Sequence, residues 1–213
     1  MKCGGVVLGM VTHHGVVDGT AALHFLHTWA AFSREGDRAV VRIPYLDRTL
    51  LCARNPPVVR LDTFTIFCPK IILSQAPGPV VVNEVLILRK DQLSTLNHIC
   101  GGKGVSTFST VSAQVWQCMS LARQLPPDST VRLAFMANIR RRMTPPLPGG
   151  YFGNAVINLS VSDEARTISS GDLAYIACRI RDTLSRVDNE VVHSAVDYLE
   201  LALAERDNRP AFG

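Results

Sequence analysis

Residues 6–36 read VVLGMVTHHGVVDGTAALHFLHTWAAFSREG, and this stretch carries the clearest structural signal in the chain. The apolar and β-branched run from Val6 to Thr12 predicts a buried strand. After a short turn, the spacing of apolar residues predicts a helix over residues 20–34. Its apolar face would carry Phe25, Trp29 and Phe32. The order strand, turn, helix places two adjacent His residues where an imidazole can point into a cleft.

The composition is that of a folded protein. Of the 213 residues, 47% are hydrophobic and 19% are charged, which predicts a sizeable core rather than a disordered chain. The net charge of +4 is too small to indicate a nucleic-acid-binding protein, although it suits an anionic ligand. Arginine supplies 18 of the 22 basic residues, and arginine favours bidentate pairing with carboxylates and phosphates.

The six cysteines are scattered without a C-x-x-C pair, which argues against a zinc or thioredoxin-like site. The uncharged stretch from Cys3 to Val17 is too short and too polar to span a membrane, and it lacks a signal-peptide pattern. We therefore expect a cytoplasmic protein with buried, reduced thiols and with no metal, membrane or nucleic-acid partner.

Beyond residue 36, predicted strands and helices alternate, which indicates an α/β chain. Residues 44–57 predict an irregular segment with one short helical turn, and residues 58–79 predict a linker or crossover. The expected strands cover residues 80–88, 131–139 and 154–161. The expected helices cover residues 91–99, 109–123 and 193–206, with a further helix that is capped by Ser170 or Asp172 and runs to about Asn189. The apolar face of helix 109–123 would carry Val111, Val115, Met119 and Ala122.

The turn after the first predicted strand, HHGVVDG, carries the most distinctive chemistry. No G-x-S-x-G motif and no catalytic cysteine setting accompany it, so His14 would act as a general base rather than in a covalent relay. From these residues alone, a second interpretation stays open: His14 is a hydrogen-bonded core histidine and Asp18 caps the following helix. A zinc site is disfavoured, because no third ligand lies at a useful spacing.

Several further motifs follow in a fixed order. They are DRTLL at 47–51, ARNPP at 53–57, STF at 106–108 before a helix with Trp116, NIRRR at 138–142, PPLP at 145–148, YFGN at 151–154 and DYLE at 197–200. Together with CGGVVLGMVTHHGVVDGTAALHFLHTW at 3–29, they closely resemble the plant BAHD acyltransferases, which use acyl-CoA donors. Within that family the chain is most similar to the hydroxycinnamoyl-CoA shikimate/quinate transferases.

The resemblance implies a partial, chloramphenicol acetyltransferase-like two-domain α/β fold with mixed sheets and flanking helices. Residues 1–57 would end the first domain, residues 58–79 would form the crossover linker, and residues 80–213 would form an incomplete second domain. The chain would cover about half of a usual family member, because the N-terminal half of the first domain and the DFGWG motif are absent. We therefore expect a fragment or a truncated copy, and a complete member would be a monomer.

The family reaction implies a role for each site residue. His14 would take the proton from an acceptor alcohol such as shikimate or quinate, whose oxygen attacks the thioester of a hydroxycinnamoyl-CoA. Other alcohols and amines stay open as acceptors. Asp18 would form an ion pair with Arg140, and Gly19 would permit the tight turn after His14. Acyl-CoA would be a co-substrate, and no permanently bound cofactor is expected.

The phosphates of CoA need donors and positive charge, and the Gly-rich loop before helix 109–123 offers both. The candidates there are Lys103, Ser106 and Thr107, although the same loop could be an ordinary exposed one. Trp116, Trp29 and Tyr151 are expected to be core aromatics rather than substrate platforms.

Two alternatives remain. Condensation domains of peptide synthetases carry a similar HHxxxDG turn, but the segments at 47–57 and 151–154 favour the plant family. The other alternative is a catalytically inactive, truncated paralogue that binds CoA or a partner, or does neither.

Overall fold

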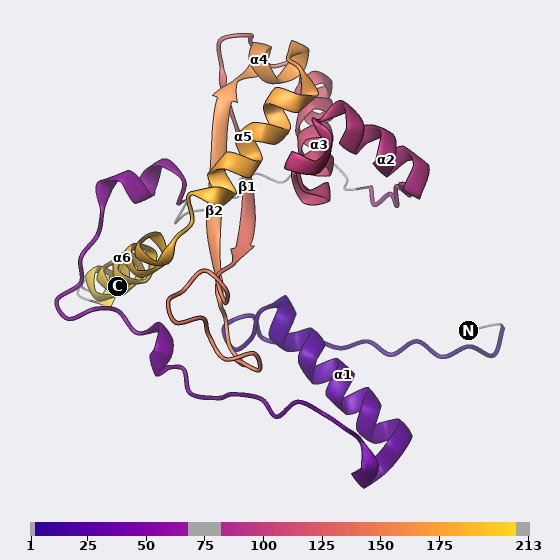
Figure 1. Cartoon of the computed structure of the whole chain (residues 1–213), viewed down its shortest axis with the longest axis vertical. Coiled ribbons are helices and arrows are strands. Elements are labelled where there is room, and N and C mark those ends of the chain that lie inside the picture. The colour runs from indigo at the N-terminus through magenta and orange to yellow at the C-terminus, as the bar shows by residue number, and fades with distance from the viewer. Residues whose placement is uncertain (1–2, 68–81, 208–213) are drawn as a thin grey trace, which may run out of the picture.

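The computed structural model describes residues 3–67 and 82–207, and its centre is a long two-stranded antiparallel sheet (Figure 1). β1 (Thr130–Asn138) pairs with β2 (Val156–Glu164) from Thr130↔Glu164 to Asn138↔Val156. Alternate residues of β2 are buried, as the two-residue period of a strand requires when one face of the sheet is covered. Both strands were expected from the sequence, and the structure confirms them with shifted ends.

Helices surround this hairpin, and every helix expected from the sequence is present with ends moved by at most four residues. The α-helices are α1 (Gly19–Glu35), α2 (Lys90–Ile99), α3 (Thr107–Arg123), α4 (Ala165–Ser170), α5 (Leu173–Ser185) and α6 (Asn189–Asp207). Short 3₁₀ turns are η1 (Gly36–Arg38), η2 (Thr49–Leu51), η3 (Leu61–Thr65) and η4 (Gly102–Gly104). Side chains that accept a hydrogen bond from the first turn begin four of the helices: Asp18 for α1, Ser106 for α3, Asp172 for α5 and Asp188 for α6.

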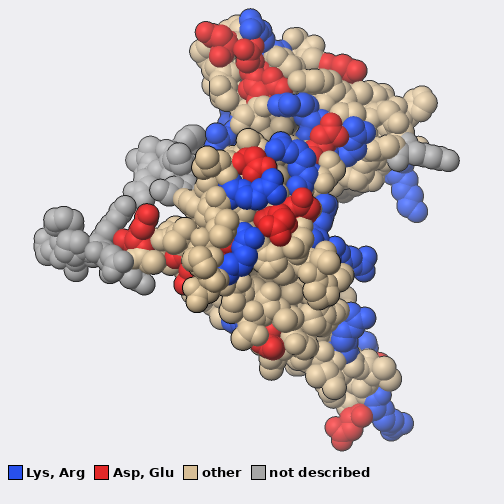
Figure 2. All heavy atoms as spheres, turned by 60° about the vertical axis from the view of Figure 1, so that its left-hand side comes forward, with Lys and Arg blue, Asp and Glu red and all other residues tan. Residues whose placement is uncertain are grey.

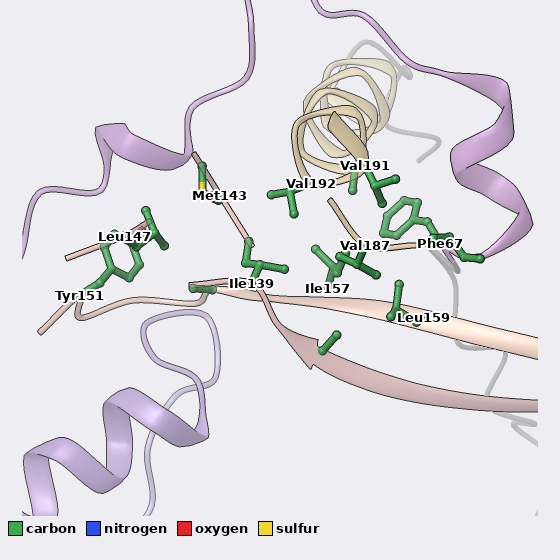
Figure 3. Close-up of a cluster of buried hydrophobic side chains, with 14 residues drawn as sticks. Phe67, Ile139, Met143, Leu147, Tyr151, Ile157, Leu159, Val187, Val191 and Val192 are labelled. Atoms are coloured by element: carbon green, nitrogen blue, oxygen red, sulfur yellow. The ribbon is translucent and has the colours of Figure 1, made fainter. Parts of the chain in front are cut away.

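The hydrophobic interior forms two cores along the hairpin. The first core joins the lower end of the hairpin and loop 139–155 to the start of α6, with Tyr151, Ile157 and Val192 among its members (Figure 3). The second core lies between α3, α5 and the upper hairpin, and it buries Trp116 and Ile176. The expectation of core aromatics is thus confirmed for Trp116 and Tyr151.

Two predicted strands are not formed. Residues 6–12 pair with no strand in the described chain, and Val6 and Val11 are 93% and 99% exposed. The described part of the other strand, residues 82–88, is likewise unpaired and exposed, while residues 80 and 81 lie outside the described residues. A strand needs the backbone of a neighbour for its hydrogen bonds, and a strand-like sequence does not supply that neighbour.

On two helices, the face that was predicted to be buried is exposed instead. On α1, the side chains of Phe25, Trp29 and Phe32 are nearly half exposed, so the expectation that Trp29 is a core aromatic is wrong. On α3, Val115 and Met119 are similarly exposed, and the face that carries Ala113 and Trp116 is buried instead. Tertiary packing selects the buried face, and apolar spacing cannot do so when two faces of a helix both carry apolar residues.

The described cysteines are free thiols, and Cys68 lies outside the described residues. The expectation of buried thiols holds for Cys100 but is wrong for Cys3, Cys52 and Cys118, which are exposed. Within residues 3–67 and 82–207, no helix combines the length and the apolar character that crossing a membrane requires.

A buried carboxylate on α6 holds the ARNPP motif and the residue that follows it. Asp197 Oδ1 accepts a hydrogen bond from the Arg54 backbone N–H at 2.7 Å, and Oδ2 accepts from Arg54 Nε at 2.7 Å and from the Val58 backbone N–H at 2.8 Å. Burial raises the pKa of Asp197, but these hydrogen bonds outweigh burial and hold that pKa below its ordinary value. Residues 54–58 are thereby fixed against α6.

The expected linker is ordered where the structure describes it. Residues 61–65 form η3, and Phe67 makes an isolated antiparallel bridge with Leu159 of β2. Residues 68–79 lie outside the described residues. The division of the chain into residues 1–57, 58–79 and 80–213 stays a prediction.

We expect Asp197→Asn to lower the free energy of unfolding by about 1.5–3 kcal/mol, because the amide replaces a charged acceptor of three hydrogen bonds. Urea unfolding followed by circular dichroism measures the loss. Glu200→Gln, an exposed acid-to-amide change on the same helix, is the matched control. Equal stability of the two variants would contradict the assigned role of Asp197.

Candidate active site

Asp18 and Arg140 form a buried bidentate ion pair at the start of α1. Arg140 Nη1 donates to Asp18 Oδ2 at 2.7 Å, and Arg140 Nη2 donates to Asp18 Oδ1 at 3.0 Å. Asp18 is 2% exposed and Arg140 is 8% exposed. The ion pair expected from the sequence is confirmed, and it joins the turn before α1 to a loop 122 residues further along the chain.

Both partners of this pair make further hydrogen bonds. The two Asp18 oxygens also accept hydrogen bonds from the backbone N–H groups of Ala21 and Ala155, each at 2.9 Å. Arg140 Nη2 donates in addition to the Gly153 carbonyl at 2.9 Å. Burial raises the pKa of Asp18, but the hydrogen bonds from Arg140, Ala155 and Ala21 outweigh it and hold that pKa below its ordinary value. Asp18 therefore stays ionised near neutral pH and serves as a structural anchor.

The turn itself is fixed by a second side chain, and its two imidazoles differ. Asn154 Nδ2 donates to the backbone carbonyl of His14 at 2.6 Å. The Nδ1 atom of His13 accepts a hydrogen bond from the Gly15 backbone N–H at 3.1 Å, so this ring is used within the turn. The His14 side chain is exposed and forms no hydrogen bond with the described residues. Both ring nitrogens of His14 are thus available to an incoming hydroxyl group.

An apolar cavity of about 260 Å³ lies beside this turn. Its lining includes Val16, Val17, Phe25 and Phe152 together with His13, whereas His14 does not line it. The ring of His14 therefore does not lie in this cavity, although the sequence predicted that it would point into a cleft. The ring is not packed inside a core either.

The candidate CoA-binding residues lie elsewhere. Ser106 caps α3 by accepting a hydrogen bond from the Ser109 backbone N–H at 3.1 Å, and Thr107 is the exposed first residue of α3. The backbone of Lys103 lies in η4, and its side chain is outside the described part of the structure. Figure 1 shows α3 beside the upper part of the hairpin and the start of α1 below its lower end. The structure thus brings Asp18, Arg140 and His14 together but does not bring residues 103–107 next to them.

Gly19 is the first residue of α1, and the structure gives no conformational reason for glycine there. Its φ lies outside the left-handed region, and a Cβ atom would meet no described atom within 4 Å. The tight-turn role expected for Gly19 therefore finds no support in the backbone.

We expect Gly19→Ala to leave the free energy of unfolding unchanged or to raise it by up to about 1 kcal/mol, because alanine restricts the unfolded chain. Gly150→Ala is the contrasting control, since a Cβ there would lie 2.7 Å from the Ile43 carbonyl oxygen. Thermal unfolding compares the two variants. A greater loss of stability in Gly19→Ala than in Gly150→Ala would restore a conformational role to Gly19.

Two contributors to this region were missed from the sequence. The YFGN motif was noted, but neither the Asn154 bond to His14 nor the Ala155 bond to Asp18 was expected. The motif was the available signal, because its asparagine lies in the same loop as Arg140. Among the described residues, no group of three or more His, Cys, Asp or Glu side chains could hold a metal ion.

The chain matches the model of the Transferase family over residues 1–210, and it therefore belongs to this family, the BAHD acyltransferases. It is 40% identical over 215 residues to putrescine hydroxycinnamoyltransferase 1 of Oryza sativa subsp. japonica, with 95% of this chain and 48% of that protein covered. It is 35% identical over 212 residues to shikimate O-hydroxycinnamoyltransferase of Nicotiana tabacum, with 94% and 48% covered. The chain spans about half the length of the curated relatives it matches.

Solved structures show the same fold. TRI101 of F. sporotrichioides, complexed with coenzyme A and T-2, matches with a TM-score of 0.64 at 16% identity over 88% of this chain and 44% of that one. Vinorine synthase matches with a TM-score of 0.56 at 20% identity over 92% of this chain and 44% of that one. These similarities confirm the predicted α/β fold class.

Proposed function

We propose that this chain carries the base-catalytic part of an acyl-CoA-dependent O-acyltransferase. The enzyme would move a hydroxycinnamoyl-type group from CoA to an alcohol such as shikimate or quinate. The observation that carries the proposal is the anchored turn, in which Asp18 and Asn154 are bonded while the His14 imidazole is left free and exposed. The similarity to hydroxycinnamoyltransferases supports the proposal that the transferred acyl group is of the hydroxycinnamoyl type. A cytoplasmic location and small-molecule partners are part of the same proposal.

In the proposed reaction, His14 accepts the proton of the acceptor hydroxyl while the hydroxyl oxygen attacks the thioester carbonyl carbon. The tetrahedral intermediate then collapses, the carbon–sulfur bond breaks, and the CoA thiolate takes the proton back from the imidazolium. Asp18 is a positioning residue, because all of its bonds hold the turn and none reaches the ring of His14.

We further propose that the CoA phosphates bind at the start of α3, near Lys103, Ser106 and Thr107. The first backbone N–H groups of a helix lack partners inside the helix, and the helix dipole favours negative charge there. The Ser106 side chain already caps the helix, so the remaining donors would come from the backbone and from Thr107.

The test is an assay of thiol release from p-coumaroyl-CoA by the purified 213-residue chain. Shikimate, quinate and putrescine are compared as acceptors, and reactions without acceptor correct for hydrolysis. We expect acceptor-dependent thiol release, with the ester or amide product identified by mass spectrometry. A folded chain that gives no acceptor-dependent release with any of the three would overturn the proposed activity.

A second candidate is a catalytically inactive, truncated paralogue that binds acyl-CoA or a partner without turnover. The observation that favours it is that His14 lines no part of the cavity beside the turn, while residues 6–12 remain unpaired. Calorimetric titration with CoA separates the two candidates when it is combined with the release assay. Binding without release by a folded chain would favour the inactive paralogue.

A further inference from the structure

A second cavity, of about 510 Å³, lies between the start of α1 and loop 139–155. Four arginines line it, namely Arg42, Arg140, Arg141 and Arg142, and no Asp or Glu does. It shares no lining residue with the cavity beside His13. Its volume falls within the range of about 300–1,000 Å³ that is usual for small-molecule sites. We call it the arginine pocket.

Three of these arginines lack a counter-charge within the described chain. Arg140 is neutralised by Asp18, but Arg42, Arg141 and Arg142 form no ion pair with a described carboxylate. Elsewhere, arginines such as Arg166 lie beside an acid, and Figure 2 shows basic and acidic side chains intermixed over the upper part of one face. The arginine pocket is thus a local excess of positive charge, which favours an anion.

Two of the three guanidinium groups are held in place by neutral carbonyls. Arg42 Nη1 donates to the Gly149 carbonyl at 2.9 Å, and Arg142 Nη1 donates to the Leu184 carbonyl at 2.8 Å. A guanidinium has five N–H donors, so each of these side chains keeps donors for a ligand. Arg141 is exposed and makes no hydrogen bond within the described residues, so all of its donors are available.

The side of the arginine pocket that carries Arg42 packs closely against Gly149 and Gly150 of loop 139–155. The Tyr45 backbone N–H donates to the Gly150 carbonyl at 2.8 Å, which holds the chain after Arg42 against that loop. A Cβ atom at Gly149 would lie 3.0 Å from Arg42 Nη1. The Arg42 side of the pocket is therefore held in place before a ligand binds, which reduces the entropic cost of binding there.

We propose that the arginine pocket binds the phosphate groups of a small molecule that carries at least two negative charges. Three uncompensated cations match a pyrophosphate or phosphate ester better than a single carboxylate, and guanidinium groups pair with phosphate through two parallel hydrogen bonds. Leu147 and Pro148 also line the pocket and offer apolar contact to the remainder of such a molecule. The proposal does not depend on acyl transfer.

The test is calorimetric titration of the 213-residue chain at low salt with pyrophosphate and, separately, with ADP. We expect saturable binding that is about 10-fold weaker in Arg141→Gln, because that variant loses charge-assisted hydrogen bonds but no bond within the fold. Arg38→Gln is the matched control, since Arg38 is an exposed arginine outside the pocket and its replacement removes the same charge.

Tighter binding of ADP than of pyrophosphate would identify a nucleotide as the source of the phosphates, and equal binding would identify the phosphate groups alone. Either result supports the site if Arg141→Gln weakens it and Arg38→Gln does not. Equal affinity of the two variants, or no saturable binding of either ligand at millimolar concentration, would overturn it. The titration requires no turnover, so its failure is separate from failure of the proposed acyl transfer.

Discussion

Replacing His14 with alanine is expected to reduce acceptor-dependent thiol release by about 10²–10⁴-fold, which is the usual contribution of a positioned general base. The ring of His14 forms no hydrogen bond with residues 3–67 or 82–207, so its removal breaks none of the hydrogen bonds described for the turn. The acylation assay with p-coumaroyl-CoA measures the loss, and circular dichroism verifies that the variant folds.

His13→Ala is the control for this substitution, because the two rings are adjacent in sequence and differ in their bonds. The His13 ring accepts one hydrogen bond within the turn, and loss of such a bond costs about 0.5–1.5 kcal/mol, or roughly tenfold at most. The His13→Ala variant should therefore keep much more activity than His14→Ala. If His13→Ala lost as much activity as His14→Ala, or more, the base would have been assigned to the wrong imidazole.

Asp18→Ala is expected to lower the free energy of unfolding by about 3–5 kcal/mol, because it leaves the buried Arg140 guanidinium without its counter-charge. It also removes the acceptors for the backbone N–H groups of Ala21 and Ala155. Urea unfolding at pH 7 measures the effect. Asp37→Ala, which removes an exposed acid in η1, is the matched control and should change stability little.

The stability difference between the wild-type chain and Asp18→Ala depends on pH, and the direction of the pKa shift of Asp18 determines how. The pKa of Asp18 is lower in the folded chain than in the unfolded one, where a free aspartate has a pKa of about 3.9. The stabilising contribution is therefore complete above that unfolded value and is lost as the pH falls through the folded value. We expect the stability gap between the wild-type chain and Asp18→Ala to be the same at pH 7 and pH 5 and to shrink in stronger acid. A gap that widened on acidification would contradict the lowered pKa.

The sequence predicted the helices better than the strands, and the difference has a physical cause. The backbone hydrogen bonds of α1 close within the helix, and Asp18 caps it from the adjacent position, so local spacing was sufficient to place its ends. Residues 6–12 have an equally clear strand pattern, yet their hydrogen bonds would depend on a neighbouring strand. The described chain has none beside them.

The candidate site, like the fold, was predicted from the sequence only in part. Asp18 and Arg140 were paired through the ordered motifs of a known family, and the structure confirms that pair. The arginine pocket could not be predicted, because Arg42 and Arg141 are far apart in sequence and meet only where loop 139–155 returns to the start of α1.

By itself, the sequence determined five of the six described α-helices, missing only α4, together with the HxxxD turn and the family to which the chain belongs, because these depend on local spacing and on motif order. Tertiary structure alone decided which face of α1 and of α3 is buried. It also decided which histidine of the turn is bonded within the turn, and where arginines without an ion-pair partner among the described residues gather around a cavity. Burial and charge balance depend on neighbours that are distant in the chain, and local patterns carry no information about them.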